Sequence, residues 1–237
     1  MQDLTRYDFI KDLQKNPENT YMFSFRNPTV MYDKVPQKLM DIINNQINKI
    51  KENDNNVEEF NAKLAGHIKK EYSLEPVIPA INNYIMMLAK NYLHSNDITD
   101  LVDILTGDLP IVLSNIWVNF QKKHEFNPIH DHSGVLSFVI WIKIPYDLEE
   151  ELGVFPKIKK KDNSTSTFNF IYTDILGRIR SENLPIDKSF EGIICLFPSK
   201  LNHLVHPFFT SDEERISVSG NLKLNIGNNN DVSFRVL

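Results

Sequence analysis

Apolar residues in the first hundred positions recur three or four residues apart, with polar residues between them. This spacing is typical of helices that bury one face. Pro36 and Pro79 stand at the start of two of these stripes, where proline favours a helix beginning. The pattern predicts helices over 36–50, 57–72, 79–92 and 98–105. Two short apolar runs before the first helix predict strands over 21–25 and 30–32.

The pattern changes at Gly107, beyond which short alternating or β-branched runs are separated by turn residues. Many short strands in succession are typical of a sandwich or jelly roll. We therefore expect an α+β, mainly β fold in a single domain over 1–237, with a mostly helical support over 1–106 packed on one face of a β core over 107–237. The predicted strands of the core are 111–121, 135–144, 165–173, 177–186, 192–197, 204–209, 216–226 and 232–236.

Composition narrows the class of protein. Hydrophobic content of 41% and charged content of 24% are ordinary for a globular chain. The net charge of −5 gives no basic field for nucleic acid or an anionic membrane, so we expect neither partner. A single cysteine, Cys195, allows no internal disulfide and is expected in the core. Without a signal-peptide stretch or a membrane-length apolar run, we expect a cytoplasmic protein, in the host cytoplasm if viral. The basic run 157–162 is expected to form a solvated loop or hairpin tip.

Two histidines lie two residues apart at the mouth of an apolar run. In an extended segment such residues point to the same face, so His130 and His132 can present their rings to one metal ion. A metal that binds neutral rings also removes the repulsion between two protonated imidazoles. Asp131 is the rival third ligand because iron sites often contain a carboxylate, but strand geometry turns it to the opposite face.

A distal ligand and a cation follow much later in the chain. After the turn at 197–199, both His203 and His206 could return beside the first pair, and spacing alone leaves this open. Arg215 and Ser217 then lie on one face of a predicted strand. Paired histidines, a distant third ligand and an arginine form the layout of a non-haem iron site with a carboxylate cosubstrate.

These residues belong to an ordered set of motifs that resembles the Fe(II)/2-oxoglutarate-dependent oxygenase superfamily. The set is similar to the prolyl-hydroxylase-like branch found in bacteria and their phages, and it covers about 110–225. The resemblance rests on Trp117-Val118-Asn119, Asn127-Pro128-x-His130-x-His132, Ser137, Gly192, Phe197-Pro198-Ser199-x-Leu201-x-His203-x-Val205-x-Pro207, Arg215-Ile216-Ser217 and Asn221.

The resemblance implies a double-stranded β-helix of the jelly-roll or cupin-like type. It also implies Fe(II) bound by His130, His132 and His203, with 2-oxoglutarate (2OG) as cosubstrate, O2 as oxidant and hydroxylation as the reaction. In the family pattern the distal ligand falls at His203 rather than His206. Arg215, helped by Ser217, would bind the far carboxylate of 2OG. The commonest pattern has Asp in the middle position, where this chain has His132.

Several points stay open at this stage. Asn119 and Ser137 lie on predicted strands near the site, and we expect Asn119 to contribute to cofactor binding. The prime substrate, a peptide or a small molecule, is unidentified, and only the resemblance points to a peptidyl proline. A cupin-like three-His dioxygenase without 2OG, in which Arg215 is structural, is the first alternative. A non-catalytic jelly-roll binding or structural protein is the second.

Overall fold

The computed structural model describes residues 11, 14–16, 18, 20, 29–52, 58–60, 66–96, 110–158 and 163–225. The predicted strands over 21–25 and 232–236 and the predicted helix over 98–105 lie outside these residues, as does most of the basic run 157–162.

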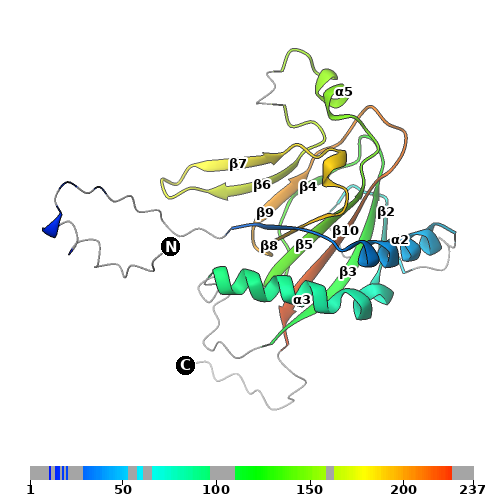
Figure 1. The fold of residues 1–237 in the computed structure, drawn as a ribbon. Coiled ribbons are helices and arrows are strands. Elements are labelled where there is room, and N and C mark those ends of the chain that lie inside the picture. The colour runs from blue at the N-terminus through cyan, green and yellow to red at the C-terminus, as the bar shows by residue number, and fades with distance from the viewer. Residues whose placement is uncertain are drawn as a thin grey trace, which may run out of the picture.

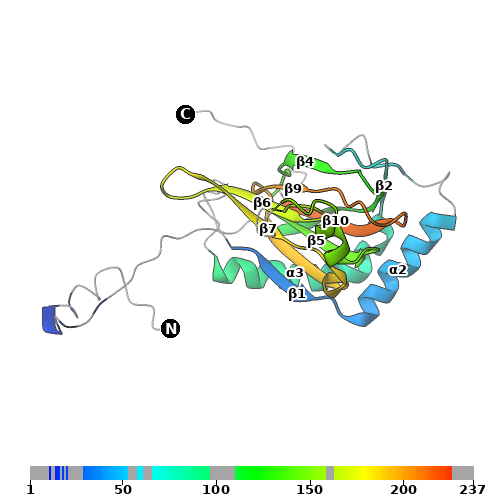
Figure 2. The ribbon, with the colours of Figure 1, turned by 90° about the horizontal axis from the view of Figure 1, so that it is seen from above.

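The described strands form two antiparallel sheets that face each other (Figures 1 and 2). The larger sheet has the order β1-β8-β5-β10-β3-β2, and the smaller has the order β4-β9-β6-β7. The strands are β1 (Met31–Lys34), β2 (Lys70–Ser73), β3 (Ile111–Gln121), β4 (Asn127–His130), β5 (Leu136–Lys143), β6 (Phe168–Thr173), β7 (Ile179–Leu184), β8 (Ile193–Pro198), β9 (Asn202–Val205) and β10 (Arg215–Leu224).

The pairing of the last eight strands is nested. β3 pairs with β10, β4 with β9, β5 with β8 and β6 with β7. The chain from β3 to β10 is thus one long antiparallel ribbon, folded so that its successive pairs alternate between the two sheets. This connectivity is the double-stranded β-helix that the resemblance implied, and the fold prediction is confirmed.

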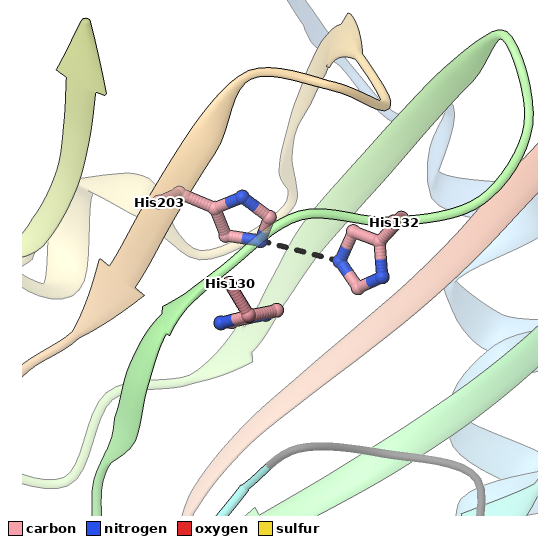
Figure 3. Close-up of side chains that lie close together, drawn as sticks. All are labelled: His130, His132 and His203. Atoms are coloured by element: carbon pink, nitrogen blue, oxygen red, sulfur yellow. Dashed lines mark hydrogen bonds between the residues drawn. The ribbon is translucent and has the colours of Figure 1, made fainter.

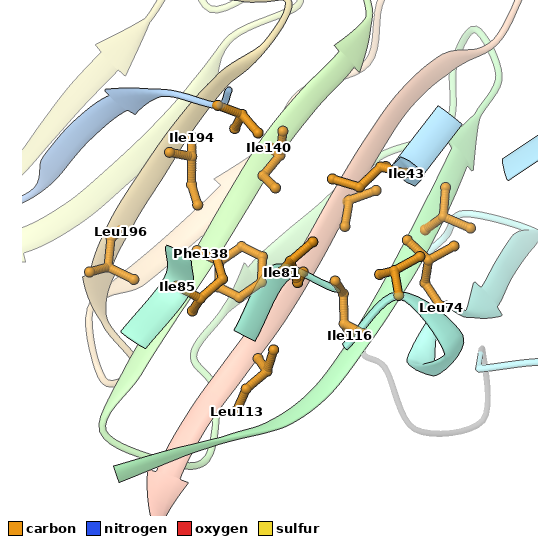
Figure 4. Packing of buried hydrophobic residues seen from close by; sticks show 14 of the residues in the cluster. Ile43, Leu74, Ile81, Ile85, Leu113, Ile116, Phe138, Ile140, Ile194 and Leu196 are labelled. Atoms are coloured by element: carbon orange, nitrogen blue, oxygen red, sulfur yellow. The ribbon is translucent and has the colours of Figure 1, made fainter. Parts of the chain in front are cut away.

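Two helices cover the outer face of the larger sheet, as the sequence predicted (Figure 4). They are α2 (Gln37–Glu52) and α3 (Ile78–Ser95), and a 3₁₀ turn (Glu75–Val77) leads into α3. Ile43 and Ile85 on the helices are fully buried in one cluster with Ile116 and Phe138 on the strands. Among the described residues, no helix has the length and apolar character needed to cross a bilayer.

The helix predicted over 57–72 is wrong where the structure describes it. Lys70–Ser73 is strand β2, and Glu59 forms an isolated bridge with Tyr72. The helical spacing of Phe60 and Ile68 has another cause, because Phe60 stacks on Trp117 and Ile68 lines a cavity. Pairing with the edge of β3 overrides the local pattern.

Two smaller differences concern the bounds of one strand and a short helix. The strand expected over 204–209 is β9, which begins at Asn202 and ends at Val205. A short helix that the sequence reading did not include, α5 (Leu148–Gly153), begins where the Asp147 side chain accepts hydrogen bonds from two backbone N–H groups. A 3₁₀ turn, Lys188–Phe190, precedes β8.

A second hydrophobic cluster fills the space between the sheets. Val139, Trp141, Phe168 and Phe197 belong to it, as does Cys195, whose complete burial confirms its expected place in the core. Several of its members, among them Trp141, Phe168 and Phe197, also line a cavity between the sheets.

Candidate metal centre and its cavity

A cavity of about 160 Å³ lies between the two sheets. Strands β2, β3 and β10 of the larger sheet contribute polar side chains to its lining, and strands of both sheets contribute aromatic and aliphatic ones. The volume is below the ~300–1,000 Å³ of pockets for drug-sized ligands, so it suits a metabolite-sized ligand. The polar side chains of these strands are Glu71, Asn119, Gln121, Arg215, Ser217 and Ser219, and the apolar lining includes Trp117, Trp141, Phe168, Ile186 and Phe197.

Three histidines converge in this cavity (Figure 3). His130 ends β4 and pairs in register with His203 on β9, so the strand pairing itself brings these two side chains together. His132 follows in the loop after β4. One ring nitrogen from each of the three histidines lies within 4.8 Å of the others, and Nε2 of His132 is 3.2 Å from Nε2 of His203.

The loop after β4 holds His132 through backbone contacts. Its N–H donates to the carbonyl of Ser199 (2.8 Å), and Val135 N–H donates to the carbonyl of Leu222 (2.8 Å). Gly134 between them has φ of +115°, and a Cβ there would lie 2.5 Å from the Leu222 carbonyl oxygen. Glycine is therefore required at this position, and the loop is fixed on both sides.

The hydrogen bonds of the outer ring nitrogens determine where the inner lone pairs lie. His130 Nδ1 is 2.7 Å from the Pro128 carbonyl, and His203 Nδ1 is 3.0 Å from the Leu201 carbonyl. A carbonyl only accepts, so each Nδ1 carries the proton and each Nε2 presents a lone pair to the cavity. Backbone carbonyls orient metal-binding histidines in this way.

Electrostatics keeps the three rings neutral. Burial lowers the pKa of His203 well below its usual value, and the neighbouring rings of His130 and His132 lower it further. Burial, then the charge of His130, lowers the pKa of His132 to about 4. The pKa of His130 is also lowered, mainly by burial. Neutral imidazoles whose ring nitrogens lie within 4.8 Å of one another can hold a divalent cation.

The two rival ligands lie elsewhere. Asp131 is on the rim, where its carboxylate pairs with Lys200 at 3.3 Å, and its side chain is 45% exposed. His206 is outside the cluster of potential ligands found among the described residues, which consists of His130, His132 and His203. The carbonyl oxygen of His206 instead accepts a hydrogen bond from Arg215.

Arg215 begins β10 and lines the same cavity, with only 4% of its surface exposed. Its Nε and Nη2 both donate to Gln121 Oε1, at 3.0 and 2.7 Å. Nη1 donates to the Tyr146 hydroxyl and the Ser166 carbonyl, and Nη2 also donates to the His206 carbonyl. All five N–H groups are therefore used, and every acceptor is neutral. Within the described part of the chain, no carboxylate pairs with this guanidinium.

Of the other polar residues predicted near the site, Asn119 and Ser217 line the cavity and Ser137 does not. Asn119 and Ser217 pair across β3 and β10 and line the cavity, with Asn119 Nδ2 3.1 Å from Ser217 Oγ. Ser137 lies behind the cavity wall, where its hydroxyl bonds Ser199 Oγ (2.9 Å) and Asn221 Oδ1 (2.7 Å). Ser137 therefore ties β5 to β10 and to the turn that holds His132.

Sequence reasoning missed Gln121, Glu71 and Tyr146. Gln121 could have been found, because it lies two residues beyond Asn119 on the same strand face. Glu71 could not, because the helix predicted over 57–72 hid the strand that carries it. Nothing in the spacing of Tyr146 indicates that its hydroxyl meets Arg215, 69 positions away.

Residues 115–221 match the sequence family described as "Putative 2OG-Fe(II) oxygenase". The resemblance to the 2OG-Fe(II) oxygenase superfamily is confirmed. The matched segment runs from β3 to β10 and contains the three histidines and Arg215 of this oxygenase-like chain. Among curated proteins no sequence match is found.

Solved structures similar to this oxygenase-like chain include three prolyl hydroxylases. The Pseudomonas putida prolyl-4-hydroxylase has 11% identity and a TM-score of 0.49, covering 82% of this chain and 91% of that chain. The viral collagen prolyl hydroxylase of Paramecium Bursaria Chlorella virus-1 has 12% identity and a TM-score of 0.47, covering 81% and 94%. A prolyl hydroxylase from Trichoplax adhaerens has 11% identity and a TM-score of 0.46, covering 84% of each chain.

Proposed function

We propose that this chain is an Fe(II)- and 2OG-dependent oxygenase that hydroxylates a C–H bond of a prime substrate. His130, His132 and His203 would hold the iron, and Arg215 would hold the far carboxylate of 2OG. When bound together, iron and 2OG supply the activation of O2, with release of succinate and carbon dioxide. The residues of the chain supply binding, orientation and a water-poor site.

The observation that carries this proposal is a buried guanidinium with neutral acceptors in the same cavity as three neutral imidazoles. Removing an ion from water costs several kcal/mol even in real proteins, and neutral acceptors only partly offset this. An anionic ligand would neutralise the positive charge of Arg215. A carboxylate matches the guanidinium fork through two parallel hydrogen bonds, and 2OG has a second anionic end for the metal.

Gln121 occupies the position that this carboxylate would take. Its Oε1 accepts from Nε and Nη2 of Arg215, the same two donors that a carboxylate would use side by side. Binding of 2OG therefore requires the Gln121 oxygen to leave the fork or to share it. Ser217 lies two residues beyond Arg215 on the same face of β10, and its hydroxyl could bind the same carboxylate. Trp141, which pairs with Ser217 on the neighbouring strand β5, and Phe168, on the facing sheet, would exclude water from this site.

A three-His dioxygenase that needs no 2OG is the second candidate, and one observation favours it. The five donors of Arg215 are all satisfied by the protein, so Arg215 could serve only to join β10 to Gln121, Tyr146 and the segments around Ser166 and His206. A set of three neutral ligands fits this reaction class as well. In that case Arg215 would have no role toward a cosubstrate.

For the prime substrate, the resemblance to the prolyl-hydroxylase-like branch supports a peptidyl proline as the narrower proposal. Fold-level similarity does not carry substrate identity, so the proposal for the reaction does not depend on it.

The two candidates differ in whether 2OG bonds directly to the metal. Anaerobic protein loaded with Fe(II) should develop a visible charge-transfer band when 2OG is added, and His203→Ala should not develop it. Loaded wild-type protein that binds iron but gives no band with 2OG would favour the second candidate.

A further inference from the structure

Strand β7 forms one edge of the smaller sheet, and no described strand pairs with its outer side (Figures 1 and 2). With β6 it forms a hairpin that projects from the body of the molecule. The first four residues of β7, 179–182, are exposed. The unpaired backbone groups of an exposed edge strand are a template for pairing with another strand.

The hairpin turn determines which backbone groups of β7 point outward. Asp174 N–H donates to the Arg178 carbonyl at 2.9 Å, and β6 and β7 then pair without a register shift. Hydrogen-bonded and non-hydrogen-bonded pairs alternate along an antiparallel ladder. The even-numbered residues of β7 therefore bond β6, whereas Ile179, Ser181 and Asn183 direct their N–H and C=O groups away from the sheet. A strand added to this edge has to pair with these three residues.

The charges on β7 are complementary to those of a second, antiparallel copy of the same strand. Arg180 and Glu182 flank Ser181 and lie on one face of β7. When two copies pair about a two-fold axis at Ser181, Arg180 of each copy stands opposite Glu182 of the other. This register also pairs Ile179 with Asn183, so the outward backbone groups of both copies meet as the ladder requires. An axis at Arg180 or Glu182 would instead place like charges opposite each other, which is destabilising.

The exposed apolar residues of the hairpin fit the same register. Ile175 and Leu176 form its turn and are 58% and 69% exposed. At the other end of β7 is a mainly apolar groove, which is lined by Tyr32, Leu184, Ser189, Phe190 and Ile193. With the axis at Ser181, Arg178 lies opposite Leu184 of the second copy. Each turn therefore reaches the groove of the other copy.

We propose that β7 is the interface of a homodimer, in which two copies of this chain join their smaller sheets edge to edge. A second copy is the occupant because β7 itself supplies the matching backbone groups, the reversed order of charges and the apolar turn for the groove. Such an isologous interface is closed by its two-fold axis. The inference goes beyond the proposed function, and the dimer requires neither iron nor 2OG.

The interface is also remote from the candidate metal centre within the smaller sheet. β7 forms one edge of that sheet, and β4, which ends at His130, forms the opposite edge. Variants of β7 therefore test the dimer without altering the metal ligands.

Sedimentation equilibrium at several protein concentrations would measure the dissociation constant of the dimer. Arg180→Glu and Glu182→Arg each replace two attractive cross-strand contacts with repulsive ones, so each should weaken self-association at least about tenfold. An equimolar mixture of the two variants should recover the dimer, because each introduced charge then faces the opposite sign. The double variant Arg180→Glu/Glu182→Arg should also recover it, since exchanging the two charges preserves their complementarity about Ser181.

Arg178→Glu is the matched control for Arg180→Glu. The Nε atoms of Arg178 and Arg180 both pair with the Asp174 carboxylate, at 3.0 and 2.8 Å, so both variants lose the same local contact. Arg178 stands opposite Leu184 in the proposed register, and the control should therefore weaken the dimer much less. Circular dichroism would verify that each variant is folded.

A second pair of variants tests the apolar contact. Leu176→Ser should weaken the dimer, whereas Met87→Ser, which changes an exposed apolar residue on α3, should not. An equal effect of the two serine variants would contradict the contact between turn and groove.

Wild-type protein that stays monomeric at every concentration would overturn the proposal. A dimer that Arg180→Glu and Glu182→Arg leave intact would also overturn it, as would a mixture of these two variants that fails to associate. The charge-transfer band of Fe(II) and 2OG reports the proposed function separately, so either proposal can fail while the other stands.

Discussion

Replacing Gln121 with glutamate places a carboxylate of the chain itself on the Arg215 fork. Gln121 Oε1 already lies 3.0 Å from Nε and 2.7 Å from Nη2, so the introduced carboxylate would form two charge-assisted hydrogen bonds with little movement. A hydrogen bond to a charged group contributes about 1.5–3 kcal/mol. If 2OG must displace this internal carboxylate, Gln121→Glu should raise the dissociation constant of 2OG by roughly 10–100-fold.

Calorimetric titration of 2OG into the Fe(II)-loaded, anaerobic protein would measure this effect. Gln121→Met is the matched control, because it keeps the length of the side chain but removes both the oxygen and the amide, and it should bind 2OG at least as tightly as wild type. Fe(II) affinity without 2OG should be unchanged in both variants, since Gln121 is not in the histidine cluster. Unchanged 2OG affinity in Gln121→Glu would refute the assignment of the Arg215 fork as the carboxylate site.

Three further predictions concern the metal centre and Glu71. His203→Ala should weaken Fe(II) binding by at least about 10–100-fold, whereas His206→Ala should bind iron nearly as wild type does, and the reverse order in a metal titration would exclude the assignment. Asp131→Ala should retain iron and His132→Ala should lose most of it, and a crystal structure with iron bound to Asp131 would restore a carboxylate triad. The pKa of Glu71 is about 7 in the folded protein against 4.5 for an unperturbed glutamate, so the folded state binds the proton more tightly than the unfolded state does. Wild type should therefore lose on the order of 3 kcal/mol of unfolding free energy as the pH rises from about 5 to 8. Glu71→Gln should abolish this pH dependence. Urea denaturation at the two pH values would measure this difference, and an equal loss in the variant would show that Glu71 is not its source.

The elements with a clear period were predictable from the sequence. β3 has the predicted bounds, and α3 begins within one residue of the predicted start, because each has a continuous apolar pattern of one period. The segment 57–72 was not predictable, because its apolar residues satisfy a helical spacing while they serve a strand, an aromatic stack and a cavity wall. The local pattern contains no information about which edge of the sheet is open.

The same distinction applies to the site. The spacing of His130 and His132 predicts a shared face if both lie in an extended segment, and the family pattern indicates His203 as the third ligand. In the structure β4 ends at His130, and His132 reaches the same cavity from the loop that follows. The partners of Arg215 come from Gln121, Tyr146, Ser166 and His206, which are brought together only by the folded sheets. The sequence therefore could not show that the protein itself satisfies all five N–H donors of Arg215.

Titration of 2OG into anaerobic, Fe(II)-loaded wild type and Arg215→Ala tests most directly whether the cavity binds metal and cosubstrate together. We expect a visible charge-transfer band in wild type and a dissociation constant roughly 10–100-fold higher in the variant, since the lost pair contributes at least about 1.5–3 kcal/mol. Fe(II) affinity should be the same in both proteins. Equal 2OG affinities, or no band in iron-loaded wild type, would contradict the 2OG-dependent mechanism and leave Arg215 with a structural role.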